Sequence, residues 1–554
     1  MNILQSLFRG PKNLFYGAAV ACLLAVLAVQ AVTAMRLKSP TVDEFAHHIA
    51  NGYSYLKTRD FRMNPGSPPL SRMLPAVPLI FLDAKLPLEH PSWAAGETVE
   101  FAKQFFYHAN PGKLDRFVFW SRVPVVILSC VFAICVWAFA ALLWGRLGGF
   151  AALLFYVFSP NILAHSQLAT ADLMVAFFSF LTFAAFWHYL RVPSWKHAIL
   201  TGLCLGGAFL SKYSAVILPP ILILTALAAG KIRLLDPRKW IVAGAVCVLT
   251  IWAGYGLEIK PLLENTPDPA KKAAMYERIG GEKLLTFAKE TPVPLATFAS
   301  SITSMMVTRY RGTSAYLMGE WSREGWWQYY FVAMAIKETI PLLALAVLGI
   351  FLVRRLRWDR VSAAVVLVPI AVFFILTLKD RAQAGIRYFL PIFPCLFILA
   401  AGSTVWLWER RNKASKAMAG LFLGWHALEA AMIYPDHLAY FNQLIGGPKN
   451  GYKYLRDSNI DWCQDLKGVG VWTREQGYGE VVVGYHGVED PAYYGIPYRP
   501  LEADELSRPR PTVYALGAHG IDATSWALRI NPTKIIGHSF FIYDLRGGIP
   551  EELE

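Results

Sequence analysis

Long apolar runs separated by charged segments fill most of this chain. A helix of about twenty apolar residues crosses the ~30 Å hydrocarbon core of a bilayer. Runs suited to this role extend over 13–35, 117–144, 148–163, 173–190, 198–211, 214–229, 240–257, 329–353, 361–378, 386–408 and 415–434. The pattern predicts an α-helical polytopic membrane protein with about 11 transmembrane helices. The runs 148–163 and 198–211 are short, so the predicted number of helices holds to within one or two.

The segments outside the runs differ in length and character. Residues 36–116 and 258–328 form long loops, and 70–82 within the first is apolar but too short to cross, which predicts a helix lying in the membrane interface. The last segment, 435–554, has strand-like stretches at 481–485, 512–516 and 540–545 and a helical stretch at 451–476. We therefore expect a membrane domain over 1–434 and a small C-terminal α/β domain over 435–554.

The distribution of charge predicts the orientation. The net charge is +14. The short segments on the side of the N-terminus carry three acids, Asp236, Asp359 and Glu409, and a large excess of bases: Arg9, Lys12, Arg146, Arg191, Lys196, Lys231, Arg233, Arg238, Lys239, Arg354, Arg355, Arg357, Arg360, Arg410, Arg411, Lys413 and Lys416. This excess equals the whole net charge and follows the positive-inside rule. It predicts a multi-pass protein of the inner (plasma) membrane with a cytoplasmic N-terminus and an extracytoplasmic (periplasmic) C-terminal domain, and it speaks against a nucleic-acid partner.

Acidic residues at the start of two outer segments are the first candidates for chemistry. Asp43 and Glu44 follow the first run, with His47 and His48 close behind, and Asp172 begins the fourth run in an otherwise uncharged stretch. Each acid alone is also explained as a solvated or helix-capping residue. The predicted topology nevertheless puts Asp43 and Asp172 on the same side of the membrane, where two carboxylates can orient an acceptor and remove its proton.

Basic residues near the same face are the second set. Lys212, Lys337 and Arg387 stand at the outer ends of apolar runs, and Arg309 lies in the second loop as a weaker candidate. Cations at this depth either snorkel to the interface or pair with an anion. A lipid phosphate is a natural partner because Lys and Arg bind phosphate oxygens strongly.

Several of these residues stand in motifs that resemble the GT-C glycosyltransferases, which take a sugar from a polyprenyl-phosphate carrier. Protein O-mannosyltransferases and the aminoarabinose transferases of lipid A belong to this group. The resemblance covers most of the chain, and its landmarks are Asp43-Glu44, Asn64–Leu70, Asp172, Ser211-Lys-Tyr213, Tyr316–Glu320, Gly325–Trp327, Arg387–Pro391, Tyr440–Asn442 and Asp457–Leu466. Relatives often carry Glu-His where this chain has Gly66 and Ser67, so we assign no metal ligand and no cofactor, and a divalent metal stays an open alternative.

The resemblance implies an inverting transfer of a monosaccharide from a polyprenyl-phosphate carrier to an acceptor on the extracytoplasmic face. Asp43 would be the general base, Asp172 would orient the acceptor or share that role, and Glu44, His47 and His48 would support them. The acceptor, a hydroxyl or phosphate of a protein, glycan or lipid, stays open. The alternatives are an aminoarabinose-type transferase acting on lipid A, a transporter or lipid flippase, and a non-catalytic assembly protein.

Overall fold

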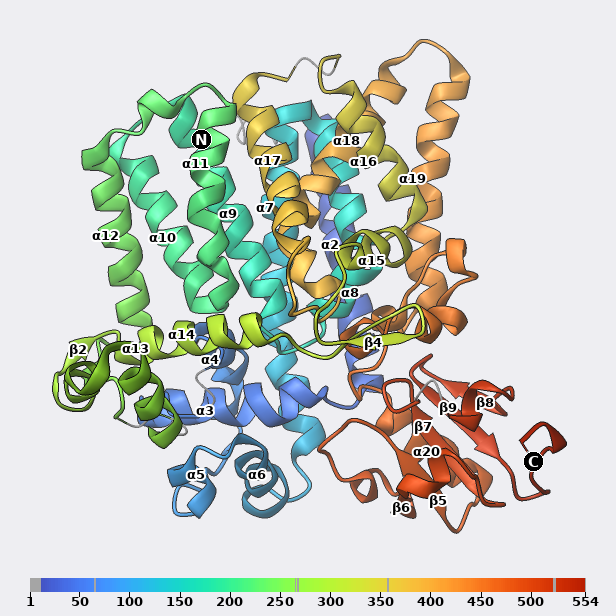
Figure 1. The fold of residues 1–554 in the computed structure, drawn as a ribbon. Helices are drawn as coiled ribbons and strands as arrows, with labels where there is room; N and C mark the ends of the chain where they lie inside the picture. The colour runs from blue at the N-terminus through green and yellow to red at the C-terminus, as the bar shows by residue number, and fades with distance from the viewer. Residues whose placement is uncertain are drawn as a thin grey trace.

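The computed structural model of this protein describes residues 11–63, 66–264, 266, 269–355, 358–521 and 525–553. Asn64 and Pro65 of the predicted motif, and Arg9 and Arg357 of the predicted cytoplasmic bases, lie outside the described residues. The chain is mostly helical, with a bundle of long helices at one end and a small sheet-containing region at the other (Figure 1).

Helices occupy all of the predicted apolar runs. The bundle contains α2 (Pro11–Leu37), α7 (Leu114–Val157), α8 (Pro160–Ser166), α9 (Asp172–Arg191), α10 (Trp195–Ser211), α11 (Leu218–Ala228), α12 (Pro237–Gly254), α15 (Tyr329–Lys337), α16 (Ile340–Leu352), α17 (Arg360–Thr377), α18 (Phe393–Glu409) and α19 (Lys413–Ile433). Within the described chain, five helical segments are long and apolar enough to cross a bilayer, and a sixth is counted if α15 and α16, bent by 118°, form one span. The protein is thus a multi-pass helical membrane protein, while the number eleven stays a prediction.

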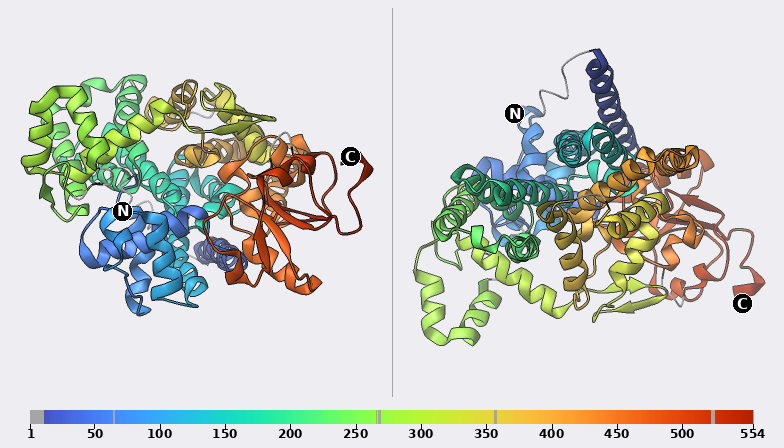
Figure 2. Two further views of the ribbon diagram at one scale, coloured as in Figure 1. Left: turned by 60° about the horizontal axis from the view of Figure 1, so that its bottom comes forward. Right: turned by 90° about the horizontal axis from the view of Figure 1, so that it is seen from above.

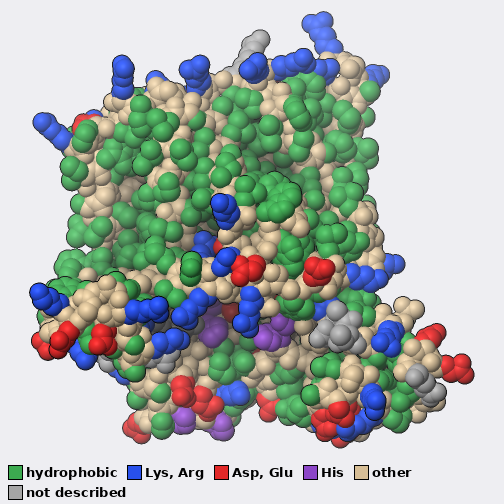
Figure 3. Space-filling view, in the orientation of Figure 1, with side chains coloured by type: hydrophobic (Ala, Val, Ile, Leu, Met, Phe, Trp, Pro, Cys, Tyr) green, Lys and Arg blue, Asp and Glu red, His purple; other side chains and the backbone are tan. Residues whose placement is uncertain are grey.

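The charges frame an apolar belt around the bundle. Lys and Arg side chains line the upper edge in Figure 3, apolar side chains cover the middle, and charges of both signs gather below. The long segments 36–116, 258–328 and 435–554 all lie at this lower end, where Figure 2 shows them side by side. The sequence pattern therefore sorted the loops correctly between two ends of the bundle.

The two long loops, 36–116 and 258–328, fold into short helices and hairpins. The first holds η1 (Glu44–Ile49), α3 (Ala50–Thr58), α4 (Leu70–Ala76), η2 (Val77–Phe81), α5 (Pro91–Ala95), α6 (Thr98–Lys103) and η3 (Gln104–Ala109). The second holds β1 (Ile259–Lys260), α13 (Pro269–Glu290), β2 (Val293–Pro294), α14 (Ala296–Arg311), β3 (Ala315–Leu317) and β4 (Glu320–Ser322). α4 and η2 form the short helix predicted over 70–82, and α14 lies crosswise beneath the bundle (Figure 1).

The C-terminal segment contains a five-stranded sheet in the order β6-β5-β7-β9-β8. Its elements are α20 (Leu466–Gln476), β5 (Val481–Gly484), β6 (Tyr498–Pro500), β7 (Val513–Gly517), β8 (Lys534–Ile536) and β9 (Phe540–Asp544). β5 pairs in parallel with β6 and β7, and β9 pairs antiparallel with β7 and β8. β5, β7 and β9 are the predicted strands. β6 and β8 were missed because each has only three residues.

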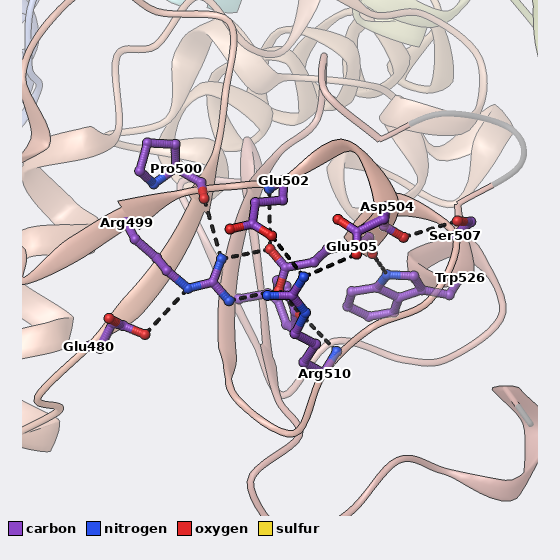
Figure 4. Close-up of polar contacts among 10 residues, drawn as sticks. Glu480, Arg499, Pro500, Glu502, Asp504, Glu505, Ser507, Arg510 and Trp526 are labelled. Atoms are coloured by element: carbon purple, nitrogen blue, oxygen red, sulfur yellow. Dashed lines mark hydrogen bonds and ion pairs between the residues drawn. The ribbon is translucent and has the colours of Figure 1, made fainter.

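A charged cluster lies at the β6 edge of this sheet (Figure 4). The carboxylate of buried Glu505 accepts hydrogen bonds of 2.6 and 2.7 Å from the two terminal nitrogens of Arg499. Arg510 donates to Glu502 at 2.7 Å, and the indole of Trp526 donates to the Glu505 carbonyl at 2.7 Å. Because these charges satisfy one another, the cluster stabilises the domain and is not a candidate ligand site.

Candidate active site

Asp43 lies where the chain leaves the first long helix and turns into η1, a single π-helical turn. Turns of this type are often found at functional sites. One oxygen of its carboxylate, Oδ2, is 3.2 Å from Nη1 of Arg387, and the side chain keeps 28% of its surface exposed. Burial acts to raise the pKa of Asp43, but nearby positive charge, above all that of Arg387, outweighs it and lowers that pKa below the ordinary value. Asp43 is therefore an ionised carboxylate with an accessible face.

Asp172, the second predicted acid, is the first residue of α9 and is buried. Its Oδ1 accepts a hydrogen bond of 2.6 Å from Nζ of Lys212, and its Oδ2 is 3.8 Å from Nη1 of Arg387. The Arg387 guanidinium thus stands between the carboxylates of Asp43 and Asp172. Residues separated by more than three hundred positions meet at one point, as the topology predicted.

These side chains line a single cavity of about 330 Å³ at the end of the bundle where the long loops lie. Its walls come from the first loop, α9, the start of η4 (Tyr213–Ile217), α14 and the short helix η6 (Ile386–Ile392) before α18. Six predicted site residues are among those lining it: Asp43, His48, Asp172, Lys212, Arg309 and Arg387. The cavity therefore combines two carboxylates with three cations.

A second cavity of about 700 Å³ continues the first, because Ser214, Arg309 and Tyr388 line both. Its apolar wall includes Ile217 of η4 and Phe373 of α17, helices of the membrane belt. The polar chamber thus has a neighbouring space with an apolar side, which suits a molecule with a charged head and a hydrocarbon tail.

Tyr388 is a member of the site that the sequence reasoning did not single out. The Nζ atom of Lys212 is 4.3 Å from the centre of its ring, and the guanidinium carbons of Arg387 and Arg309 are 5.7 and 5.9 Å from it. Cations are attracted to the face of an aromatic ring. The available signal was its place directly after Arg387 in the motif.

Glu44 has a role different from that of its neighbour Asp43. Its carboxylate is fully buried and accepts hydrogen bonds of 2.8 and 2.7 Å from Nε and Nη2 of Arg122. It also accepts from the backbone N–H groups of Thr41 at 2.9 Å and Ala169 at 2.7 Å. Glu44 therefore ties the first outer loop to α7 and to the segment before α9 without lining the cavity. Arg122 was not anticipated, because no local pattern indicates which base a buried acid meets.

The two histidines differ in position. His48 is buried and lines the cavity. Burial, together with the charge of Arg72, lowers the pKa of His48 to about 3, so its imidazole is neutral at physiological pH. His47 is half-buried, and its Nδ1 is 3.2 Å from the Thr98 hydroxyl. Because the neutral His48 ring carries no charge, Arg387 is the group that chiefly keeps the Asp43 carboxylate ionised.

Lys337 stands apart from the other predicted cations. It does not line the cavity, and its Nζ donates to the carbonyls of Leu438 at 2.8 Å and Asn459 at 2.6 Å. α15 ends at this residue, and the chain then bends sharply into α16. The Lys337 side chain consequently points toward buried backbone carbonyls. We therefore leave Lys337 out of the phosphate-binding set. Arg309 lines both cavities and pairs with Asp380 at 3.1 Å.

Among the described residues, no group of three or more His, Cys, Asp or Glu side chains is placed to hold a metal ion. Gly66 and Ser67, where relatives often have Glu and His, line the cavity without supplying such a ligand. The geometry defines a membrane-embedded site with an ionised acid, a bridging arginine and further cations at one end of an apolar bundle.

Comparison with known proteins adds the enzyme class. Residues 115–254, which include Asp172 and Lys212, match the family model described as dolichyl-phosphate-mannose-protein mannosyltransferase. This match confirms the predicted resemblance to lipid-phosphate-dependent glycosyltransferases, and the chain is assigned to the glycosyltransferase class of enzymes. No curated protein sequence matches it significantly.

Two solved structures have a similar overall arrangement at low sequence identity. ArnT from Cupriavidus metallidurans bound to undecaprenyl phosphate has a TM-score of 0.49 and 11% identity, over 90% of this chain and 93% of that one. The archaeal oligosaccharyltransferase AglB from Archaeoglobus fulgidus, in complex with an inhibitory peptide and a dolichol-phosphate, has a TM-score of 0.40 and 14% identity, over 96% of this chain and 75% of that one.

Proposed function

We propose that this protein is an inverting glycosyltransferase that moves a monosaccharide from a polyprenyl-phosphate carrier to an acceptor on the extracytoplasmic face. The observation that carries the proposal is the single cavity in which the Asp43 carboxylate faces Arg387, with Lys212 and Arg309 in the same wall. A negatively charged headgroup fits the cations. An acceptor hydroxyl fits the exposed face of the acid.

The donor would enter through the larger cavity. Its hydrocarbon tail would lie along the apolar wall near Phe373 and Ile217, within the belt of the bundle, and its phosphate would reach Lys212, Arg309 and Arg387. Positive charge at these positions stabilises the phosphate as it leaves the anomeric carbon. This route requires the carrier to lie in the membrane, because the polar chamber alone is too small for a prenyl chain.

Donor binding would also prepare the base. Arg387 pairs with Asp43 and holds its pKa low, which makes the carboxylate a weak base. A bound phosphate competes for the guanidinium, since arginine binds phosphate through two parallel hydrogen bonds. Loss of that pair raises the pKa of Asp43, and the acid can then accept the acceptor's proton as the sugar is transferred.

Substitution of Asp43 tests this function. We predict that Asp43→Asn lowers kcat by about 10²–10⁴-fold, the usual contribution of a general base. The assay measures transfer from undecaprenyl-phosphate-linked sugars in membrane vesicles, with expression followed by immunoblot. Asp83→Asn is the matched control, because Asp83 is an exposed acid of the same outer loop that does not line the cavity. Wild-type transfer by Asp43→Asn would refute the base role.

The competing functions make different predictions. A transporter or flippase would move the carrier lipid without cleaving the sugar–phosphate bond, so its product would retain the phosphate. An aminoarabinose-type transferase would change the mass of lipid A. Mass spectrometry of lipid A and of total glycans from cells with and without the gene product separates these outcomes.

A further inference from the structure

A short stretch of the C-terminal segment, residues 456–466, lies behind the cavity wall and contacts the two segments that carry Asp43 and Arg387. It is paired with the backbone just before Asp43. The Ser39 N–H donates to the Gln464 carbonyl at 2.9 Å, and the Val42 N–H donates to the Trp462 carbonyl at 3.1 Å. The Ser39 hydroxyl also donates to the Cys463 carbonyl at 2.8 Å. The position of Asp43 therefore depends on this stretch.

The same stretch also holds the loop that carries Arg387. The Asn459 side-chain oxygen accepts a hydrogen bond of 3.0 Å from the Ile386 N–H. The Ser458 hydroxyl donates to the Ala384 carbonyl at 2.9 Å, and the Arg387 Nε donates to that carbonyl as well, at 2.9 Å. One segment of the C-terminal domain thus fixes the backbone of the acid and the backbone of the arginine.

Trp462 of this stretch touches the arginine side chain itself. The guanidinium carbon of Arg387 is 4.2 Å from the centre of the Trp462 ring, and the indole is 4% exposed. The indole packs beside Ala164 and Leu168, which precede Asp172, and beside Leu438. A planar guanidinium stacks well on an aromatic face, and such a contact limits the directions in which it can point.

We propose that Trp462 is a positioning residue for the transfer reaction: its indole holds the Arg387 guanidinium between Asp43 and Asp172, where a donor phosphate would be bound. The inference rests on the proposed function and goes beyond it, because it makes the C-terminal domain a part of the donor site. Because the Trp462 ring is buried and packed on both sides, it keeps its position when the donor binds. The Arg387 guanidinium is therefore already oriented when the phosphate enters.

Three variants test this role. Trp462→Ala removes the ring and should raise the KM for the lipid-linked donor by about tenfold, in line with the usual worth of a cation–π contact. It should change kcat less, because Asp43 is intact. Trp462→Phe restores a ring and should recover the KM to within about threefold. Trp472→Ala is the matched control, since Trp472 lies on α20 in the same domain, half-buried and away from the cavity.

A cryo-EM structure of Trp462→Ala adds a readout that does not depend on activity. We expect Arg387 to leave its place between Asp43 and Asp172. An Arg387 that keeps this place, or a donor KM in Trp462→Ala equal to that of Trp472→Ala, overturns the inference. If the wild-type protein transfers no sugar, the proposed function fails, while the position of Arg387 in the variant still decides whether Trp462 positions it.

Discussion

The neighbouring acids Asp43 and Glu44 have different roles, so their substitutions should have different effects. Substitution of Asp43 should lower activity with little loss of stability, whereas substitution of Glu44 should lower stability. Glu44 is paired with Arg122 in the interior, and the two side chains are 0% and 1% exposed. Glu44→Ala leaves the Arg122 charge buried without its carboxylate, and breaking such a pair costs about 3–5 kcal/mol. The backbone N–H groups of Thr41 and Ala169 lose their acceptor in addition.

That cost corresponds to a change of about 10²–10⁴-fold in the ratio of folded to unfolded protein. Thermal unfolding of the detergent-solubilised protein measures it, and Glu44→Ala should melt far below wild type. Glu97→Ala is the control, since Glu97 is an exposed acid of the same loop whose side chain caps nothing, and its effect should stay within ~0.5 kcal/mol. Asp43→Asn should melt near wild type.

A double variant separates the ion pair from the packing. Replacing both partners, as Glu44→Leu with Arg122→Met, removes the uncompensated charge and should regain much of the stability lost in Glu44→Ala. A Glu44→Ala protein that melts like Glu97→Ala would refute the reasoning. So would a double variant less stable than Glu44→Ala, because the loss would then come from packing and not from a stranded charge.

Three further predictions concern the site and the C-terminal domain. Lys212→Ala removes the cation that pairs with Asp172 at 2.6 Å and should raise the donor KM about tenfold or more, with Lys212→Arg recovering part of it. Gly385 has a φ of 88°, and an added Cβ would lie 2.9 Å from the Ser458 hydroxyl oxygen, so Gly385→Ala should lower stability by about 1–3 kcal/mol in a thermal-shift assay. Burial and nearby acids raise the pKa of Asp461 to about 6, against the hydrogen bonds that it accepts from two backbone N–H groups. The folded protein thus binds this proton more tightly than the unfolded chain, so stability should fall as the pH rises from about 4 to about 6, and Asp461→Asn should lose that part of the slope in melting curves.

The sequence predicted the features that depend on local pattern. Every apolar run is helical, the three long segments lie at one end, and the topology brought Asp43 and Asp172 to the same face. Helix periodicity and charge bias act over short distances, so they can be read from a single chain. Lys212 and Arg387 were selected from their positions at the ends of apolar runs, and both also stand in the family landmarks.

The missed features depend on contacts between distant segments. Nothing local shows that Arg122 neutralises Glu44 or that Trp462 covers Arg387. The partners are 78 residues apart in the first case, and in the second they lie in the helical bundle and in the C-terminal segment. Lys337 resembled the other cations in the sequence. The bend after α15, which directs it into buried carbonyls, is a tertiary feature.

The pairing of residues 39 and 42 with residues 462 and 464 has a consequence for biosynthesis. The first helix and the acid that follows it are made early, yet their final arrangement awaits a partner that leaves the ribosome more than four hundred residues later. A nascent chain already inserted in the membrane would carry an unfinished chamber. The chamber would then be complete only once residues 435–554 have folded back onto the first loop.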